Sequence, residues 1–446
     1  MGDDDDAPAD RRRQRAVPSG RLSRLGSFGK LAGGVAGGMI GEGARRLAAG
    51  ERPRMSDMLL TPGNAKKVAD QLAHLRGAAM KLGQMISMDA GDMLPPELAM
   101  IMARLRDQAQ HMPPGQLKTV LADAWGPDWR QRFTRFGPTP VAAASIGQVH
   151  RATTKDGRDL AIKVQYPGVA RSIDSDVDNV ATLLRVSGLV PKSLDLSPLL
   201  SEAKTQLREE ADYEREGQEL ERFAALLADD PRYIVPRLDP EFTTTDILAM
   251  TFVEGAPIES IEAEPQAVRD TVIGNLIELV LRELFDFGHM QTDPNFANYR
   301  YQADEGRLVL LDFGASRAIE PRVSAAYRTL LSAVFKGDRD KVREAAIDAG
   351  FLGPAAAAKH RALVDRMIDI ILVEIGRPDR FDFGDRAFVS VLAEMGQDMA
   401  EDRATWHLPP ADLIFAQRKI SGTALLAARL KAKVDIRALA APYLTG

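Results

Sequence analysis

The segment at residues 289–314 constrains the fold of this chain more than any other part. It reads HMQTDPNFANYR, then a short polar turn, then LVLLDFG. Asp293 and Asn298 are five residues apart in a Pro-containing loop, and the apolar run 308–311 predicts a strand that ends at Asp312. Three oxygen-bearing side chains are therefore expected to meet at one hairpin. Carboxylate and amide oxygens are ligands of hard cations such as Mg²⁺, so the hairpin is suited to a metal–nucleotide complex.

The spacing of these polar residues is informative in itself. An Asp, an Asn five residues later and a subsequent Asp-Phe-Gly are spaced as in the catalytic and metal-binding loops of protein kinases. Asp-Phe-Gly alone is a weak signal, because any strand can end in Asp and turn on Gly. A second segment supports the pattern: AIKV predicts a strand with Lys163 opposite apolar neighbours, where a kinase keeps the lysine that binds the α- and β-phosphates. A lone strand lysine is usually solvent-exposed, so the prediction rests on the combination.

A loop and a strand, with the sequence VAAASIGQVH, precede the lysine strand, and a turn between the two strands is predicted at Asp156-Gly157. A kinase has three glycines in this loop, whereas this chain has Ala and Ser with one glycine, Gly147. Replacing Gly by Ala removes the freedom to adopt positive φ, so a stiffer loop is predicted. The residues expected to contact ATP are Ala142, Ala143, Ala144, Ser145, Ile146, Gly147, Gln148 and Val149, together with Lys163.

Two helical stretches are predicted next, at residues 169–189 and 197–227. The second contains the acidic run EEADYERE. Such a run is usually solvated, but in a kinase-like fold one helix glutamate pairs with the strand lysine. Glu210 and Asp212 are the candidates for this acidic motif, with a second metal ion or Lys81 as alternative partners.

The remaining chain is predicted to hold two more strands and then mainly helices. The strands are expected at residues 233–237 and 247–252, and the second leads to Val253-Glu254-Gly255, a predicted hinge where Glu254 contacts ATP. Helices are expected at residues 265–287 and from residue 322 onward. After Asp-Phe-Gly, the short sequence SRAIEP leads directly into a helical pattern. An ordinary kinase has a long activation segment there, which builds the platform for a peptide, so a peptide substrate is not expected.

Composition excludes several classes of protein. The chain has 446 residues, 45% of them hydrophobic, which supports a sizeable core. Its formal net charge is −5, with basic and acidic residues mixed, so nothing points to nucleic acid. The absence of cysteine excludes disulfides and thiolate sites. No run reaches the roughly 18–20 apolar residues needed to cross a bilayer, and the opening GDDDDAPADRRRQR predicts a disordered tail in place of a secretory signal.

A glycine-rich segment at residues 26–43 reads GSFGKLAGGVAGGMIGEG. Glycine recurs at every fourth position from Gly29 to Gly41, a spacing that lets two helices approach closely. The segment is too short to span a bilayer. Two interpretations remain open: a helix that lies on a membrane surface or pairs with a second copy to give a homodimer, and a flexible linker, because so much glycine disfavours a helix.

Helical patterning begins near Asn64, and the motif Lys81-Leu-Gly-Gln84 lies within it. Seven of the sixteen methionines fall between Met80 and Met112. Such a stripe is more often core than an adaptable binding surface. Lys81 and Gln84 are one turn apart on an apolar helix and therefore need solvent or a polar site to face.

Together these motifs resemble the UbiB family of atypical kinase-like proteins, and most closely its coenzyme Q biosynthesis branch. The resemblance extends from about residue 26 to near the C-terminus, and the order of the motifs is highly specific. It implies an α+β fold, namely an atypical protein-kinase-like, two-lobed fold with an N-terminal helical extension over the active site. The predicted domains are a tail with the glycine-rich segment (1–55), the helical extension (56–137), an N-lobe (138–255) and a helical C-lobe (256–446).

Residue roles follow from the resemblance by position. It implies that Lys163 holds the α- and β-phosphates, that Asp293 is the catalytic-loop aspartate, and that Asn298 and Asp312 hold Mg²⁺. The acidic motif would comprise Asp212 and Glu210, and Glu210 would also contact ATP. The implied regulatory residues are Asp212, Lys81 and Gln84. The helical extension would bring Lys81 and Gln84 to the site, where Lys81 has either a catalytic role or that of a lid against peptides. The implied cofactors are ATP or ADP and Mg²⁺.

The resemblance implies an ATPase or small-molecule kinase that supports ubiquinone biosynthesis at a membrane surface. Its substrate would be a small molecule or lipid, such as a prenyl-quinone precursor, and its partners other coenzyme Q biosynthesis proteins. The expected location is cytoplasmic and peripheral to the inner membrane, or mitochondrial in a eukaryote. Many bacterial relatives end in a transmembrane hairpin, whereas this chain ends LKAKVDIRALAAPYLTG, so peripheral attachment is expected. The alternative is a non-catalytic, nucleotide-sensing scaffold or lipid-extracting protein of the same pathway.

Overall fold

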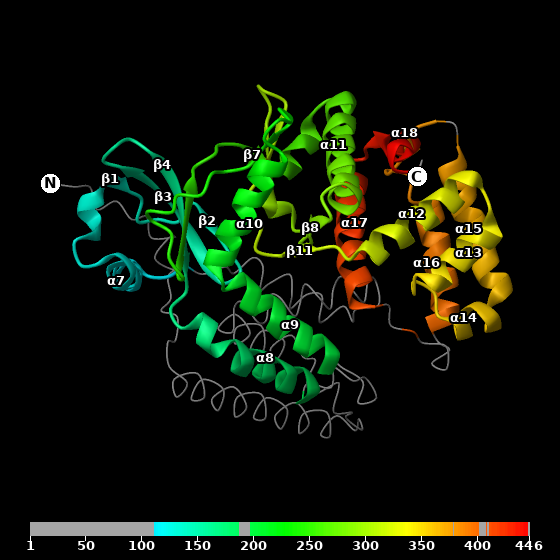
Figure 1. Cartoon of the computed structure of the whole chain (residues 1–446), viewed down its shortest axis with the longest axis horizontal. Helices are drawn as coiled ribbons and strands as arrows, with labels where there is room; N and C mark the ends of the chain where they lie inside the picture. The colour runs from blue at the N-terminus through cyan, green and yellow to red at the C-terminus, as the bar shows by residue number, and fades with distance from the viewer. Residues whose placement is uncertain (1–110, 187–196, 378, 401–406, 408–409, 445–446) are drawn as a thin grey trace, which may run out of the picture. The chain divides into compact units, whose positions relative to one another are not determined.

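The computed structural model describes residues 111–186, 197–377, 379–400, 407 and 410–444, and these form an α+β structure (Figure 1). The chain divides into two compact units. Unit 1 comprises Met1–Gln218 and Arg237–Val253, and unit 2 comprises Glu219–Pro236 and Glu254–Gly446. Residues 56–110 of the predicted helical extension, including Lys81 and Gln84, and the glycine-rich segment lie outside the described residues. The rest of the predicted extension, residues 111–137, is described and contains a helix, a 3₁₀ turn and a strand.

Unit 1 is built on an antiparallel sheet in the order β1-β3-β4-β6, with the short strand β2 paired to β3. In the register of the sheet, Lys163 on β4 lies between Val149 on β3 and Leu248 on β6. The predicted turn at Asp156-Gly157 is confirmed: Gly157 has a φ of 90°, which suits glycine. The strands are β1 (Phe133–Phe136), β2 (Ala142–Ala143), β3 (Gly147–Thr154), β4 (Asp159–Gln165) and β6 (Ile247–Thr251).

An aromatic cluster packs beside this sheet. It is formed with the helix α7 (Pro114–Trp125) and the 3₁₀ turn η3 (Trp129–Arg132). Large aromatic side chains bury much apolar surface, and tilted or edge-on pairs add to the stability. The ring contacts join Trp125, Trp129, Phe133, Phe136 and Phe242.

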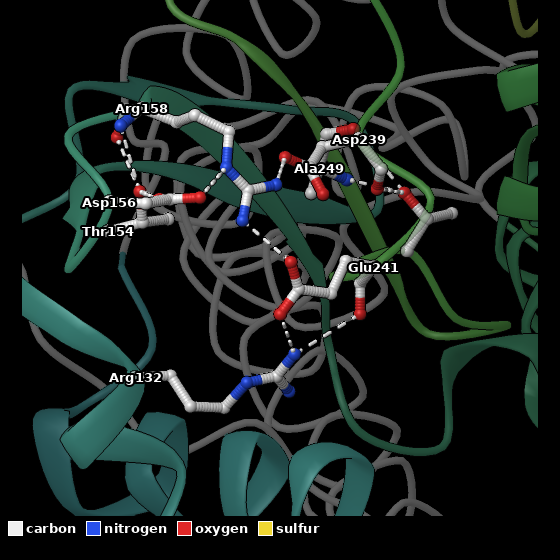
Figure 2. A network of polar contacts seen from close by, with 8 residues as sticks. Arg132, Thr154, Asp156, Arg158, Asp239, Glu241 and Ala249 are labelled. Atoms are coloured by element: carbon white, nitrogen blue, oxygen red, sulfur yellow. Dashed lines mark hydrogen bonds and ion pairs between the residues drawn. The ribbon is translucent and has the colours of Figure 1, made fainter.

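A network of charged side chains fixes the β3–β4 hairpin to the segment before β6 (Figure 2). The guanidinium of Arg158 lies between three carboxylates and donates to Asp156 at 2.9 Å, Asp239 at 2.5 Å and Glu241 at 2.6 Å. Arg132 donates to the other oxygen of Glu241 at 2.9 Å. The hydrogen bond from Thr154, followed by that from Arg158, lowers the pKa of Asp156 to about 2. These contacts hold the hairpin that carries β4 and its lysine.

Three helices complete unit 1 and lead into unit 2. The helices α8 (Val169–Val186) and α9 (Ser197–Glu210) lie side by side (Figure 1), and α10 follows at Tyr213–Leu226. The expected single helix at residues 197–227 is therefore wrong. The chain breaks at Ala211-Asp212 because the Asp212 carboxylate accepts the backbone N–H of Arg215 at 2.9 Å and so starts a new helix.

Unit 2 combines short strands with helices, and the helices α11 and α17 lie against each other (Figure 1). One sheet has the order β5-β10-β9-β7, and β11 pairs with β8. A further pair is β12 with β13. The strands are β5 (Tyr233–Ile234), β7 (Ala256–Pro257), β8 (His289–Gln291), β9 (Tyr299–Gln302), β10 (Arg307–Leu310), β11 (Ser316–Ala318), β12 (Phe381–Asp382) and β13 (Lys433–Val434). The main helices are α11 (Gln266–Phe285), α12 (Pro321–Lys336), α13 (Arg339–Asp348), α14 (Pro354–Lys359), α15 (Arg361–Gly376), α16 (Ala387–Ala400), α17 (Ala411–Arg429) and α18 (Ile436–Ala440).

The predicted strand at residues 308–311 and the predicted helix at residues 265–287 are confirmed within one or two residues, as β10 and α11. The expected strand at residues 233–237 is shortened to β5, which pairs with β10 in parallel. Within the part of the chain that the structure describes, no helix combines the length and the hydropathy required to cross a bilayer.

Candidate functional site

In unit 1, the candidate functional side chain is that of Lys163. Its ammonium donates to both carboxylate oxygens of Glu216, at 2.7 and 2.9 Å, and lies 5.1 Å from the centre of the Tyr213 ring. Lys163 is 8% exposed and Glu216 2% exposed. A buried ion pair of this geometry keeps the lysine charged and directed, as a phosphate-binding cation requires.

The identity of this glutamate corrects the sequence prediction. The structure gives the pairing role to Glu216, in the first turn of α10, and not to Glu210 or Asp212. Glu210 accepts the hydroxyl of Ser145 at 2.6 Å, and Asp212 caps the start of α10. The signal that could have located Glu216 is Asp212 itself, because an N-cap residue marks where a helix begins and therefore sets which side chains it presents.

The loop before the lysine strand is a tight hairpin. Ala144 N–H donates to the carbonyl of Gly147 at 2.9 Å, and Tyr166 N–H donates to that of Ile146 at 2.9 Å. A methyl group at Gly147 would lie 2.5 Å from the Val164 carbonyl oxygen and 2.9 Å from the Tyr213 hydroxyl, so the backbone approaches its neighbours too closely for any larger residue.

Of the residues expected to contact ATP, several are enclosed by protein. Ile146, Gly147 and Gln148 are buried, and Gln148 accepts the N–H of Met112 at 2.7 Å. The loop residues Ala142, Ala143, Ala144, Ser145 and Val149 are exposed or half-buried. Glu254 belongs to unit 2, where its carbonyl accepts the side chain of Gln302 at 2.8 Å.

In unit 2, two loops are joined at both ends by hydrogen bonds. The first, Thr292 to Asn298, is called the catalytic loop below; the second runs from Leu311 to Ala315. Thr292 donates its N–H and its hydroxyl to the Ala315 carbonyl at 3.1 and 2.7 Å. At the other end, Leu311 N–H donates to the Asn298 carbonyl at 3.0 Å. The two loops are therefore held next to each other.

These loops carry the three polar residues singled out in the sequence. Asn298 is buried, and its amide nitrogen lies 3.4 Å from the Asp293 carbonyl oxygen and 3.5 Å from a carboxylate oxygen of the same residue. Asp312, half-buried, accepts the N–H of Gly314 at 3.0 Å. The Asn298 amide thus directs its nitrogen toward Asp293, which leaves its oxygen as the atom suited to a cation.

The donor set fits Mg²⁺. Asn298 and Asp312 offer oxygen ligands, and Mg²⁺ takes one or two protein oxygens and completes its octahedron with water and phosphate. Among the described residues, no group of three or more His, Cys, Asp or Glu side chains could hold a metal ion alone. An Asn and an Asp oxygen leave most of the Mg²⁺ coordination positions to water and nucleotide phosphates.

Aromatic packing fixes the Asp-Phe-Gly turn. Phe313 is 2% exposed, and its ring centre lies 4.7 Å from that of Phe223 on α10. His289, on β8, is paired at 2.6 Å with Glu219, also on α10. Sequence reasoning singled out neither Glu219 nor Phe223 as part of this surrounding shell.

The segment after the Asp-Phe-Gly turn is short. Ser316–Ala318 forms β11 against β8, and α12 begins at Pro321. The expected absence of a long activation segment is confirmed in this described part of the chain. A strand lysine with a helix glutamate beside it, and two joined loops with oxygen ligands suited to Mg²⁺, define the class as a kinase-like protein. The short segment after these loops marks it as an atypical one.

A comparison with protein families gives the same result. The model described as the ABC1 atypical kinase-like domain matches residues 104–346, more than half of the chain. The chain belongs to this family of atypical kinases, so the resemblance to the UbiB family and the kinase-like α+β fold are confirmed.

Curated relatives match along most of the chain. The chain is 39% identical to "Atypical kinase coq-8, mitochondrial" of Caenorhabditis elegans, over 95% of this chain and 57% of the relative. It is 37% identical to "Atypical kinase COQ8, mitochondrial" of Saccharomyces cerevisiae, over 94% of this chain and 84% of the relative. The chain therefore spans a little more than half the length of the nematode protein.

Among solved structures, the chain is similar to Rv3197 from Mycobacterium tuberculosis, determined as a complex with erythromycin. The TM-score is 0.58 at 26% identity, and the match covers 84% of this chain and 95% of the other.

Proposed function

We propose that the chain is an ATP-dependent atypical kinase or ATPase that binds Mg²⁺–nucleotide and supports coenzyme Q biosynthesis. The observation that carries this proposal is the pair of joined loops in unit 2, which brings Asp293, Asn298 and Asp312 onto adjoining backbone. The buried Lys163–Glu216 pair in unit 1 supports it independently. The names of the nematode and yeast relatives point to the same pathway.

Each residue has a distinct role in this proposal. Lys163 neutralises the α- and β-phosphates of ATP, and Glu216 keeps its ammonium in place. Asn298 and Asp312 hold Mg²⁺, which supplies positive charge for the phosphate oxygens when it is bound. Asp293 orients the attacking hydroxyl or water and accepts its proton. The hairpin from Ala142 to Val149 covers the phosphates.

The acceptor is proposed to be a small molecule or lipid, such as a prenyl-quinone precursor, and not a protein. The short connection from β11 to α12 supports this, because a peptide has no platform on which to lie. Lys81 and Gln84 would act from the helical extension as a lid against peptides. Labelled ATP would test the lid: Lys81→Ala should retain label on the protein, whereas unlabelled protein with reduced ATPase would assign Lys81 a catalytic role.

Hydrolysis and binding can be separated with two variants. Asp312→Asn should abolish Mg²⁺-dependent stabilisation by ATP, because an amide is a much weaker ligand than a carboxylate. Asp293→Asn should keep that stabilisation and lose turnover, because the residue acts on the nucleophile. Thermal-shift titration and single-turnover ATP hydrolysis are the measurements. Full ATPase in Asp293→Asn would support the alternative, a nucleotide-sensing scaffold or lipid-extracting protein.

The proposed location is a membrane surface, to which the chain attaches peripherally. The nematode and yeast relatives are named mitochondrial. Five cations accompany the glycine-rich segment: Arg21 and Arg24 precede it, Lys30 lies within it, and Arg45 and Arg46 follow it. Each cation near an anionic surface contributes roughly 1 kcal/mol. Replacing all five by Gln in the full chain should reduce flotation with anionic liposomes. Unchanged flotation would mean that these cations do not hold the chain on the membrane, and would favour the interpretation of the segment as a flexible linker.

A further inference from the structure

Lys419, on α17, is a buried cation that the proposed chemistry does not use. Its side chain is 3% exposed. The ammonium donates to the side-chain oxygen of Gln291 at 2.9 Å and to the hydroxyl of Tyr299 at 2.8 Å, and it lies 3.6 Å from a carboxylate oxygen of Glu283 on α11. A fully enclosed ammonium is costly unless each of its hydrogens has a partner, and here three oxygens surround it.

The two neutral partners of Lys419 lie at the two ends of the catalytic loop. Gln291 directly precedes the catalytic loop and Tyr299 directly follows it. One ammonium therefore binds both ends of the loop that carries Asp293 and Asn298. The nitrogen of the Gln291 side-chain amide is buried without a hydrogen-bond partner among the described residues, so the bond from Lys419 to the amide oxygen is the polar contact that orients this side chain.

One turn farther along α17, Gly422 meets the middle of the same loop. A methyl group at Gly422 would overlap the Cβ of Pro294 and lie 2.8 Å from its Cγ. Glycine inside a helix costs roughly 1 kcal/mol relative to alanine, and here its small size lets the helix backbone lie directly against Pro294. Two residues of α17 thus contact the loop at its ends and at its centre.

The charge on Lys419 is consistent with this role. Burial alone would lower the pKa of Lys419, but the Glu283 carboxylate and the Tyr299 hydroxyl outweigh it and raise the pKa above the usual value. The charge of Asp293 acts in the same direction, which places its carboxylate within electrostatic reach of the ammonium. These interactions favour the charged form of the Lys419 ammonium.

We infer that α17 positions the catalytic loop: Lys419 binds its two ends through Gln291 and Tyr299, while Gly422 provides the surface on which Pro294 rests. Lys419 is a positioning residue and not a catalytic one, since it acts on Asp293 and Asn298 through the loop. The inference rests on the proposed function only for the catalytic role of the loop. The ordering of the loop by α17 is independent of that role.

A simpler role for Lys419 would be to neutralise Glu283, without any effect on the loop. Two variants of the full chain separate these roles. In Glu283→Gln/Lys419→Met both charges are removed together, so no uncompensated charge remains in the interior. In Tyr299→Phe the ion pair is kept, and only the bond to the downstream end of the loop is lost. Arg429→Met, which removes a half-exposed cation from the last turn of the same helix, is the control.

Hydrogen–deuterium exchange without nucleotide measures the ordering of the loop directly. Peptides that cover residues 290–300 should exchange at least tenfold faster in Glu283→Gln/Lys419→Met and faster at the downstream end in Tyr299→Phe, while Arg429→Met matches the parent. Gly422→Ala, which keeps the ion pair, should also accelerate exchange in these peptides. Parent-like exchange of these peptides in Glu283→Gln/Lys419→Met, Tyr299→Phe and Gly422→Ala would overturn the inference. Because no ATP is used, that result does not depend on whether the chain hydrolyses ATP.

Turnover and stability then distinguish positioning from charge neutralisation. Displacement of reacting groups by about 1 Å can cost on the order of a hundredfold in rate, so the double variant should lose roughly tenfold to hundredfold in kcat while its Tm stays close to that of the parent. If Lys419 only neutralises Glu283, the double variant will have the kcat and the Tm of the parent. That result would show that the positioning role is wrong. If the parent shows no turnover, the proposed function fails, while the exchange experiment still decides the role of α17.

Discussion

At the residue scale, the buried Lys163–Glu216 ion pair is the main feature of the candidate site in unit 1. Both side chains are withdrawn from water, and their bidentate contact at 2.7 and 2.9 Å compensates for the lost hydration. Glu210 has a different neighbour, the Ser145 hydroxyl in the hairpin that we propose covers the phosphates. The two glutamates lie six residues apart in sequence yet serve different groups.

This difference can be measured with two amide variants. Glu216→Gln leaves the Lys163 ammonium buried without a counter-charge, and breaking a buried pair in this way costs roughly 3–5 kcal/mol. Glu210→Gln keeps an acceptor for Ser145 and should cost much less. The measurements are urea unfolding and MgATP titration. The control is Glu214→Gln, which changes an exposed residue of α10, the helix that carries Glu216. A larger loss of nucleotide affinity in Glu210→Gln would restore Glu210 as the functional partner of the lysine.

At the element scale, the start of α10 is the decisive feature. Asp212 accepts the N–H of Arg215, and its own carbonyl accepts the N–H of Glu216 at 3.0 Å. This cap fixes the first turn and therefore the direction of Glu216. Asp212, a predicted regulatory residue, thus has a structural role that the prediction did not include.

Asp212→Ala should lower the free energy of unfolding by about 1 kcal/mol, the usual cost of losing an N-cap. It should also weaken MgATP binding, because the fraying turn carries Glu216. Asp212→Asn keeps an oxygen at the capping position and should behave like the parent in both urea unfolding and nucleotide titration. If Asn is as harmful as Ala, the charge of Asp212 matters and the cap does not explain its role.

How far the sequence predicts this structure depends on the distance between the interacting residues. The β10 strand that ends near Asp312, the β4 strand with Lys163 and the Asp156-Gly157 turn were all predictable, because each depends on a local pattern. The partner of Lys163 was missed because a cap within the acidic run divides one expected helix into two. Lys419 had no sequence signal: it lies 128 residues from Gln291, and only the fold brings them together.

At the scale of the whole molecule, separate segments of unit 1 are joined by a buried chain of hydrogen bonds. Met112 donates its N–H to Gln148, whose side-chain nitrogen lies 2.8 Å from Nε2 of His150. The Nδ1 of His150 lies 2.7 Å from the carbonyl oxygen of Gly137. Because a carbonyl can only accept, these partners assign the proton to Nδ1 and leave Nε2 as the acceptor from Gln148. The neutral imidazole completes this series of hydrogen bonds. A second proton, on Nε2, would point at the Gln148 amide N–H, which is also a donor.

The stability of the protein should therefore fall as the pH decreases below about 6.5. Burial chiefly lowers the pKa of His150 from 6.5 to about 4, against the hydrogen bond to Gly137, which raises it. A histidine whose pKa is lower in the folded state is protonated first in the unfolded chain, so stability is complete above pH 6.5 and is lost on acidification. Since one pKa unit corresponds to 1.36 kcal/mol, the difference between 6.5 and about 4 amounts to roughly 3 kcal/mol once the pH is below 4.

His150→Gln isolates this contribution, because an amide of similar reach can donate to Gly137 and accept from Gln148 without titrating. The variant should lose less stability than the parent between pH 7.5 and pH 5, by roughly 2 kcal/mol, in urea unfolding at fixed ionic strength. Carboxylates such as Asp230, whose pKa is lowered to about 2 mainly by its hydrogen bond from Arg232, lose their stabilisation only as the pH falls below about 4 and thus outside this window. Parallel stability curves for parent and variant from pH 7.5 to pH 5 would mean that His150 is not the residue that makes unit 1 sensitive to acid.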